Sequence, residues 1–303
     1  MREAVSGREP DAFSSYHPAL LFLYFCGVLF FCMFLTHPVP LVLAFCAELC
    51  YSVLLNGAKA VRFQLLGLLP VSLAVALLNP LLNRAGKTIL FSAFGGPVTL
   101  ESLAFGAVYA LAFASAVTAF SCFNRVMTSD RLMFLFGRLS PVLSLMFSLT
   151  LRFVPRYKAQ VRTLAEAQRG IGLDPAHGTV PERVRNGAEL VSALITWALE
   201  NAVESADSMK ARGFGLKGRT SFSVFVWRKR DRALLSAELA SLGVVLLGLL
   251  SGAFRSEYIP AIAISGLSGS SVPYYAACAL FCFLPVLANM REILLWNRLK
   301  SVN

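Results

Sequence analysis

The chain has 303 residues, of which 56% are hydrophobic and 15% are charged, and its mean hydropathy is +0.65. A composition this apolar excludes an ordinary soluble domain and indicates an integral membrane protein. The formal net charge of +11 is explained by the excess of basic residues that membrane proteins carry on their cytoplasmic side, so we expect no nucleic-acid partner.

Six apolar runs are long enough to cross, or nearly cross, a bilayer as helices, because a spanning helix needs about 20 residues. They lie at residues 19–37, 39–55, 64–82, 101–122, 233–253 and 272–290. The fold class that we predict is an all-α integral membrane protein of about six transmembrane helices. We divide the chain into an N-terminal membrane domain of four helices (1–123), a cytoplasmic segment (124–232) and the C-terminal membrane helices (233–303).

The distribution of basic residues predicts the orientation. With the N-terminus inside, the cytoplasmic segments hold 25 Lys and Arg residues and the outside loops hold only 3, namely Arg84, Lys87 and Arg255. The segment from Asn124 to Arg232 supplies most of this excess, but the short loops lean the same way. Both termini and the central segment are therefore expected on the cytoplasmic side of a bacterial or archaeal cell membrane.

Few ionisable residues fall within the apolar runs. Glu101 lies at a predicted helix start, where a carboxylate interacts favourably with the helix dipole. Glu48 is a lone acid without an obvious partner, and proton or ion coupling is the alternative to a structural role for it. The stretch Ala85 to Thr88 is similar to the end of a phosphate-binding loop, but Leu81 stands where the first glycine is required. We therefore expect no cofactor bound by this chain and no ATP hydrolysis by it alone.

The histidines and cysteines give no sign of an enzyme. The three histidines are scattered in sequence, and the seven cysteines lie in or beside apolar runs without metal-ligand spacing. We expect the cysteines to behave as small buried hydrophobic residues. The positions are His17, His37, His177, Cys26, Cys32, Cys46, Cys50, Cys122, Cys278 and Cys282.

The central segment begins with a short helix, capped by Thr128 to Asp130 and ending before Gly137. Ser140 and Pro141 then start a long helix whose first half is apolar and whose second half is basic. A continuous helix from Pro141 to Arg169 would span about 44 Å. We expect Pro155 to kink or break it and Gly170 to end it as a C-terminal cap.

A second long helix follows a polar connection from Leu173 to Arg185. We expect Asn186 to cap it and Gly213 to stop it after Arg212. Its charge is mainly acidic, whereas the charge of the first long helix is mainly basic. The two helices are therefore predicted to pack on each other, with their arginine-bearing ends displayed separately.

Both long helices end in the pattern Arg-Gly-x-Gly-Leu, and the two Arg-Gly pairs are 43 residues apart. Arginine can fork onto a carboxylate or onto backbone carbonyls, and glycine permits close approach of a partner, so the repeat indicates two similar docking sites. Helix capping alone is the alternative explanation, because arginine in a last turn followed by glycine is a common stop signal. After the second helix, Trp227 beside a basic cluster is typical of an anchor at the membrane surface.

The chain resembles the transmembrane T component of energy-coupling factor (ECF) vitamin and metal transporters, the family that includes the cobalt-transport membrane subunit. The match depends on three stretches of the sequence. They are Ala211-Arg212-Gly213 with Ser205 to Lys210 before it, Arg169-Gly170, and Leu151 to Arg156. In that family two Ala-Arg-Gly motifs end the coupling helices and dock on two ABC-type ATPases. The second Ala-Arg-Gly motif is intact here, at Ala211 to Gly213. In the first motif, Gln168 is inserted between Ala167 and Arg169. The residues that the resemblance assigns to ATPase coupling are Ala167, Gln168, Arg169, Gly170, Ala211, Arg212 and Gly213.

The resemblance implies a non-catalytic scaffold of an ATP-driven importer for a vitamin or another micronutrient. Its partners would be two ABC-type ATPase subunits, which bind ATP and Mg, a membrane-embedded substrate-binding S component, and the lipid bilayer. The apolar halves of the long helices, around Leu143 to Phe153 and Leu190 to Trp197, would carry the S component. A sixth membrane span is more than the simplest form of the family needs.

Two other functions compete with this reading. A self-contained secondary transporter or channel would need polar groups or broken helices at the middle of the membrane, and no matched pair of these occurs in the two halves of the chain. An intramembrane enzyme would need a cluster of acids, or a histidine-containing nucleophile set, within the membrane. The scattered histidines and sparse carboxylates do not favour one.

Overall fold

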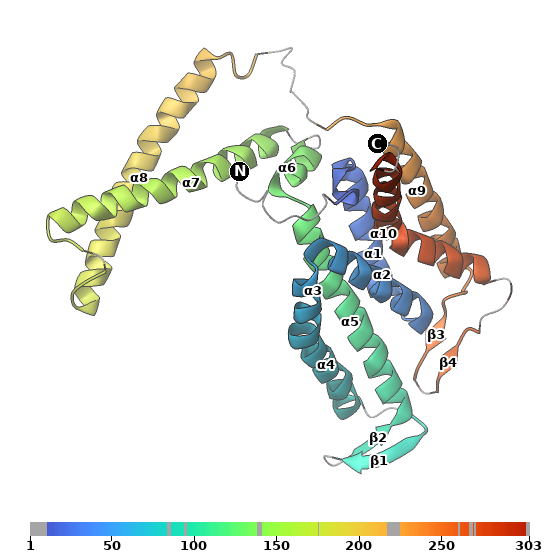
Figure 1. Ribbon diagram of the computed structural model, residues 1–303. Coiled ribbons are helices and arrows are strands. Elements are labelled where there is room, and N and C mark those ends of the chain that lie inside the picture. Colours follow the sequence, from blue (N-terminus) through green and yellow to red (C-terminus); the bar gives the residue numbers. More distant parts are fainter. Residues whose placement is uncertain are drawn as a thin grey trace. The chain divides into compact units, whose positions relative to one another are not determined.

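The computed structural model of the protein describes residues 11–83, 86–93, 96–137, 141–174, 176–216, 225–259, 261–266, 269 and 271–300. Helices account for most of these residues (Figure 1). The helices are α1 (Pro18–Phe34), α2 (Pro38–Asn56), α3 (Ala58–Phe63), α4 (Leu69–Leu82), α5 (Leu100–Val126), α6 (Ser129–Gly137), α7 (Pro141–Gly170), α8 (Val180–Ala211), α9 (Lys229–Leu250) and α10 (Val272–Lys300).

The remaining elements are short. A 3-10 turn (Phe13–Ser15) precedes α1, and a π-helical turn (Gln64–Leu68) joins α3 to α4. Two antiparallel hairpins connect membrane helices on the side that the charge distribution assigns to the outside. Their strands are β1 (Ile89–Ala93) with β2 (Gly96–Thr99), and β3 (Ser256–Glu257) with β4 (Ala263–Ile264).

Five helical segments in the described part of the chain are long and apolar enough to cross a membrane. They are Pro38–Asn56, Ala58–Leu82, Leu100–Val126, Lys229–Leu250 and Val272–Leu295. The first predicted span is a shorter apolar helix, α1, of 17 residues. The prediction of an all-α membrane protein is confirmed, and each of the six apolar runs contains a helix.

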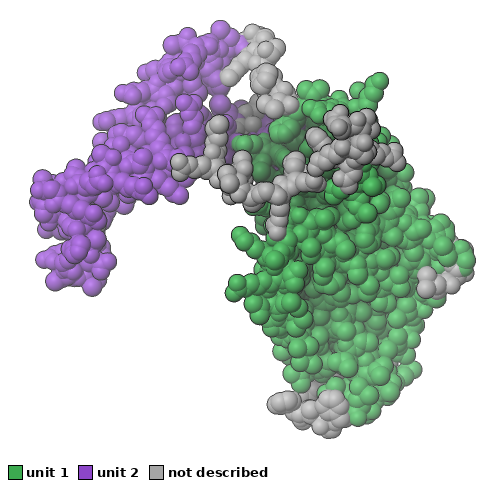
Figure 2. All heavy atoms as spheres, in the orientation of Figure 1, with its two compact units in different colours: residues 1–131, 225–303 green, residues 132–224 purple. Residues whose placement is uncertain are grey.

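Two compact units make up the fold, and Figure 2 colours them separately. Residues 1–131 and 225–303 form unit 1, which contains the candidate membrane helices, and residues 132–224 form unit 2. Within unit 1, α5 contacts α1, α2 and α4, while α10 contacts α2 and α9. The predicted segment boundaries at 124 and 232 stay predictions.

Close backbone contact joins α4 to α5. A Cβ atom at Gly106 would lie 2.5 Å from the carbonyl oxygen of Ala76, so only glycine fits there. Small residues at such crossings are typical of helix packing in membranes, where van der Waals contact replaces the hydrophobic effect. At the π-helical turn, Gln64 donates a 2.9 Å hydrogen bond to Thr118 of α5. A polar bond between helices therefore supports the backbone where the α-helical pattern is interrupted.

The polypeptide before α1 is held by side chains from distant helices. The amide oxygen of Asn289 accepts a hydrogen bond from the backbone N–H of Ala12 at 2.7 Å, and its nitrogen donates to Asp11. Tyr51 also donates to Asp11, at 2.8 Å. The ring of His17 stacks on the ring of Trp227, with centroids 3.9 Å apart. The tryptophan predicted to lie at the membrane surface therefore also packs against another side chain of the protein.

The two acidic residues of the apolar runs, Glu48 and Glu101, form hydrogen bonds with residues that are distant from them in sequence. Glu48 is 3% exposed and accepts a 2.8 Å hydrogen bond from Ser115 of α5. Glu101 lies in the first turn of α5, as predicted, and its carboxylate accepts a 2.7 Å hydrogen bond from the Thr88 hydroxyl. The expectation of seven buried cysteines is wrong in part, because Cys26, Cys46 and Cys50 are exposed on the protein surface.

Candidate functional site

Helix α7 is continuous from Pro141 to Gly170, and Pro155 does not break it. The start at Pro141 agrees with the sequence prediction, since proline at a first helical position lacks only an N–H that would have no partner there. The predicted capping residue Ser140 lies outside the described residues. The helix is amphipathic, and its apolar first half exposes Met146 and Phe147.

Helix α8 begins earlier than predicted. It starts at Val180, with Thr179 before it and Pro181 in its first turn, so Asn186 is an interior residue and not its cap. The Glu182 carboxylate accepts a 2.9 Å hydrogen bond from the backbone N–H of Thr179. That bond lowers the pKa of Glu182. Asn186 instead donates from its side chain to the carbonyl of Asp174, at 3.2 Å.

The two long helices contact each other, as predicted, and they cross near their middles (Figure 1). The contact is aromatic: Tyr157 of α7 packs edge-on against Trp197 of α8 with ring centroids 5.5 Å apart. The guanidinium of Arg156 lies 5.6 Å from the same tryptophan ring. Among the described residues no ion pair joins α7 to α8, so their opposite charges do not act through direct pairing.

The end of α7 differs from the prediction that Gly170 caps it. Gly170 is the last helical residue, and the positive φ of a helix-ending glycine belongs to Gly172, at 82°. The backbone N–H of Leu173 donates to the carbonyl of Gln168 at 2.9 Å, and that of Gly172 donates to Arg169 at 3.1 Å. These two bonds form a Schellman motif, which satisfies the last carbonyls of the helix.

The end of α8 is a second Schellman motif, and here the predicted glycine is correct. Gly213 has φ 78°, and its N–H donates to Lys210 at 2.9 Å. The N–H of Phe214 donates to the carbonyl of Met209 at 3.0 Å. Arg212 occupies the position immediately before the left-handed glycine.

The two Arg-Gly-x-Gly-Leu motifs have the same sequence pattern, but the helix ends at a different position within each motif. The first motif places its second glycine, Gly172, in the left-handed conformation, whereas the second motif uses its first glycine, Gly213. Arg169 therefore lies within the last turn of α7, while Arg212 lies at the boundary of α8. The shared sequence pattern therefore does not give the two arginines the same backbone position.

Arg169 has an intramolecular partner. Its Nε donates to the Asp174 carboxylate at 3.3 Å, and the Arg169 side chain remains 55% exposed. The same carboxylate accepts from the backbone N–H of Ala176 at 2.9 Å and bonds the Nδ1 of His177 at 2.6 Å. These bonds, first that from Ala176, then those from His177 and Arg169, lower the pKa of Asp174 to about 2.

Asp174 was not recognised in the sequence, although one signal was available. An aspartate in a connection can accept the N–H two residues later and form an Asx turn, as Asp174 does with Ala176. That pattern marks a structured turn after α7. It does not predict the contact with Arg169.

Arg212 is exposed, and no ion pair involving its side chain occurs among the described residues. Its neighbour Lys210 lies 4.0 Å from Asp207 at the surface. Ala211, the last residue of α8, is also exposed. The end of α8 thus presents an exposed guanidinium that has no ion pair within the described part of the chain and lies beside small residues.

At the first end, Ala167 and Arg169 are exposed, whereas Gln168 is half-buried. The carbonyl of Gln168 accepts two capping hydrogen bonds, from Ile171 and from Leu173. The side-chain oxygen of Gln168 is buried without a hydrogen-bond partner in the described part of the chain. The inserted glutamine is therefore part of the helix end, and its side-chain oxygen is shielded from solvent.

Helix α8 also carries an exposed apolar stripe, which we define by six residues on one face. Their exposures lie between 53% and 72%. The spacing of four and seven residues keeps them on one side of the helix, while Trp197 lies on the side toward α7. The stripe consists of Val180, Val184, Val191, Ile195, Leu199 and Val203.

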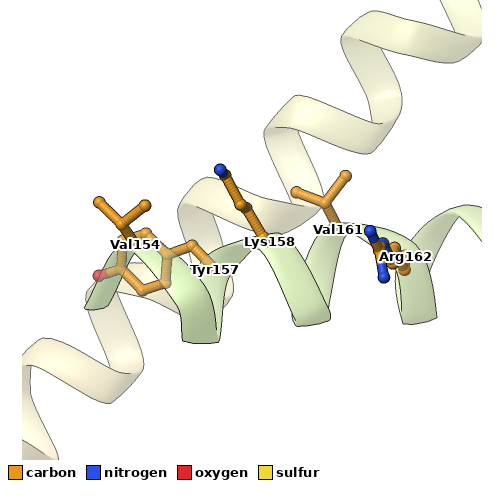
Figure 3. Close-up of a pocket in the computed structure, with 5 residues that line it drawn as sticks. All are labelled: Val154, Tyr157, Lys158, Val161 and Arg162. Carbon is orange, nitrogen blue, oxygen red and sulfur yellow. The ribbon is translucent and has the colours of Figure 1, made fainter. Parts of the chain in front are cut away.

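On α7 a shallow groove of about 450 Å³ lies along one face (Figure 3). Its lining combines apolar or aromatic side chains with two basic ones. The lining residues are Val154, Tyr157, Lys158, Val161 and Arg162. Because a single helix supplies this lining, the groove is an open surface and not an enclosed substrate cavity.

Comparison with known proteins identifies one matching family and several similar proteins. The family model described as cobalt transport protein (CbiQ) matches residues 14–222. Three similar proteins are each named energy-coupling factor transporter transmembrane protein EcfT. That of Exiguobacterium sibiricum is 34% identical over 111 residues, which are 36% of this chain and 42% of the relative. That of Bacillus subtilis is 36% identical over 94 residues, 31% of this chain and 36% of the relative.

The third relative, from Bacillus selenitireducens, is 27% identical over 228 residues, which cover 71% of this chain and 84% of the relative. The first two matches therefore span less than half of the length of those proteins, whereas the third extends over most of both chains.

Proposed function

The chain belongs to the cobalt transport protein (CbiQ) family, and on this premise we propose that it is the energy-coupling transmembrane scaffold of an ECF-type importer. In this role it links two ABC-type ATPase subunits to a membrane-embedded S component that binds a vitamin or another micronutrient. ATP and Mg are bound by the ATPases. This chain contributes no catalytic residue and moves in response to their closure.

The observation that carries the proposal is the end of α8. Arg212 stands exposed between Ala211 and Gly213, at a helix boundary, without an ion pair among the described residues. A guanidinium presents several N–H groups in a planar fork, which fits a carboxylate or a pair of backbone carbonyls on a partner. The flanking small residues let the partner approach closely. Arg169 offers a second guanidinium at the end of α7.

The exposed stripe of α8 supports a contact with an apolar partner. Six aliphatic side chains with more than half of their surface exposed are costly in water, but they are stable against the bilayer surface or another membrane protein. We assign this stripe, together with the exposed first half of α7, to the S component at the cytoplasmic surface of the membrane. Figure 1 shows both helices in full length.

The decisive experiment is a double charge reversal. The Arg169→Glu/Arg212→Glu variant is expected to remain in the membrane but to lose its association with the ATPase subunits, whereas Arg212→Glu alone weakens it strongly. The measurement is co-purification of ATPases with the tagged chain. A matched control is Arg183→Glu/Arg185→Glu, which makes the same charge change near the start of α8 and is expected to keep the ATPases.

Normal co-purification with the double variant at the two helix ends would contradict the proposal. Substrate uptake by the purified chain in liposomes, without ATPases, would favour a self-contained transporter instead.

A further inference from the structure

The two candidate docking arginines differ in their ion pairs within the chain. Arg212 has no ion pair among the described residues, whereas Arg169 is bound by Asp174. We propose that Asp174 is a positioning residue, which holds the Arg169 guanidinium in the orientation that docks on an ATPase subunit. This inference rests on the proposed function and adds a residue to it.

The geometry of the ion pair supports positioning and not blockage. Asp174 contacts the Nε atom of Arg169, at 3.3 Å, and no hydrogen bond from either terminal nitrogen of Arg169 occurs among the described residues. The two terminal nitrogens can together form a bidentate fork onto a second carboxylate. Asp174 therefore occupies one edge of the guanidinium and leaves the fork free, with the side chain 55% exposed.

Asp174 is itself fixed from several directions, so it can serve as a reference point. Its carboxylate accepts hydrogen bonds from the backbone of Ala176 and bonds the His177 ring, and its carbonyl accepts from Asn186 of α8. The last bond ties the turn to the second long helix. The position of Arg169 is thus set by α8 as well as by α7.

The register of the α7 end gives Arg169 a different position from that of Arg212. Because Gly172 and not Gly170 ends the helix, Arg169 lies back within the last turn and not at the boundary. A long, exposed side chain in that place loses rotamer freedom when a partner binds it. Fixing the side chain beforehand removes part of that loss, which is the usual effect of preorganisation on affinity.

The test is a double-mutant cycle on the full-length chain with its ATPase subunits. Asp174→Asn removes the charge, but its amide oxygen can still accept from Ala176 and preserve the turn. We expect it to raise the dissociation constant of the ATPases about 3- to 10-fold, the range for immobilising one flexible side chain. In an Arg169→Ala background, where Arg212 still provides one attachment, the same change is expected to have less than about a 2-fold effect.

Two further variants separate positioning from a general effect on the turn. His177→Ala removes another partner of Asp174 without touching Arg169, and we expect it to leave the dissociation constant within about 2-fold of wild type. Asp174→Glu restores the charge and is expected to recover most of the affinity. An equal effect of Asp174→Asn in both backgrounds would assign Asp174 to the turn alone and overturn the inference, and so would unchanged or tighter binding in the wild-type background.

Failure of this inference can be told apart from failure of the proposed function. If the Arg169→Glu/Arg212→Glu variant keeps its ATPases, the docking role itself is wrong. If that variant loses them while Asp174→Asn binds like wild type, only the role of Asp174 is wrong.

Discussion

Two glycines in one motif have opposite backbone requirements. Gly172 has φ 82°, whereas Gly170 is helical, and a Cβ atom at either position would meet nothing within 4 Å. Alanine at Gly172 must therefore adopt a left-handed conformation at a cost of about 1 kcal/mol or more, while alanine at Gly170 favours the helix by about 0.5–1 kcal/mol.

We expect Gly172→Ala to speed hydrogen exchange of the Leu173 amide, which donates to Gln168, by about 5-fold, in line with that cost. Gly170→Ala serves as the matched control and should slow it or leave it unchanged. Mass-spectrometric hydrogen exchange on the peptide containing both residues measures the difference. The opposite ranking would mean that Gly170 ends the helix.

Two glycines of unit 1 differ in how much room a side chain would have. Gly106→Ala would place a Cβ atom 2.5 Å from the Ala76 carbonyl, so α4 and α5 must separate, at a cost of about 1–3 kcal/mol. Gly243 of α9 meets nothing within 4 Å, and Gly243→Ala is expected to be neutral or stabilising. Thermal unfolding in detergent distinguishes them, and equal melting temperatures would show that the close crossing is absent.

At this scale the sequence predicts residue type better than residue role. The two Arg-Gly-x-Gly-Leu motifs offer two glycines each, and each glycine is followed by an apolar residue that suits a Schellman motif. Local sequence therefore cannot decide which glycine is left-handed. Likewise Glu48 and Ser115 are far apart in sequence, so their hydrogen bond depends on tertiary packing that no local pattern describes.

The elements were largely predictable because hydropathy and capping are local. The starts of α6 and α7 follow from an N-terminal capping cluster and from Pro141, as the sequence indicates. The start of α8 was placed too late because Asn186 is also a good capping residue. The Thr179 to Glu182 pair, with Pro181 between, is the stronger signal, since it supplies a capping box and a favourable first turn.

The crossing of α7 and α8 depends on one aromatic cluster, which gives an element-scale prediction. Trp197→Ala removes the ring that contacts Tyr157 and Arg156, worth about 0.5–1.5 kcal/mol beyond its buried area. We expect a broader distance distribution between spin labels placed on the two helices. Leu199→Ala, a change in the exposed stripe on the other side of α8, should leave the distribution unchanged. Equal broadening by both variants would show that the aromatic contact does not fix the crossing of the two helices.

At the scale of the whole molecule, the charge distribution makes one prediction that the fold alone does not make. The 25 to 3 division of basic residues predicts that the hairpin loops lie outside and unit 2 lies inside. Lys87 and Arg255 are exposed residues of the predicted outside loops, and Arg185 is an exposed residue of α8. These three positions can report the orientation without disturbing the core.

In a background without the seven native cysteines, Lys87→Cys and Arg255→Cys are expected to react with a membrane-impermeant maleimide added to intact cells. Arg185→Cys should react only after the membrane is permeabilised. If Lys87→Cys and Arg185→Cys were labelled from the same side, the orientation would be wrong. The proposed docking would then fail too, because ATPase subunits can reach the ends of α7 and α8 only if unit 2 lies in the cytoplasm, where ATP is available.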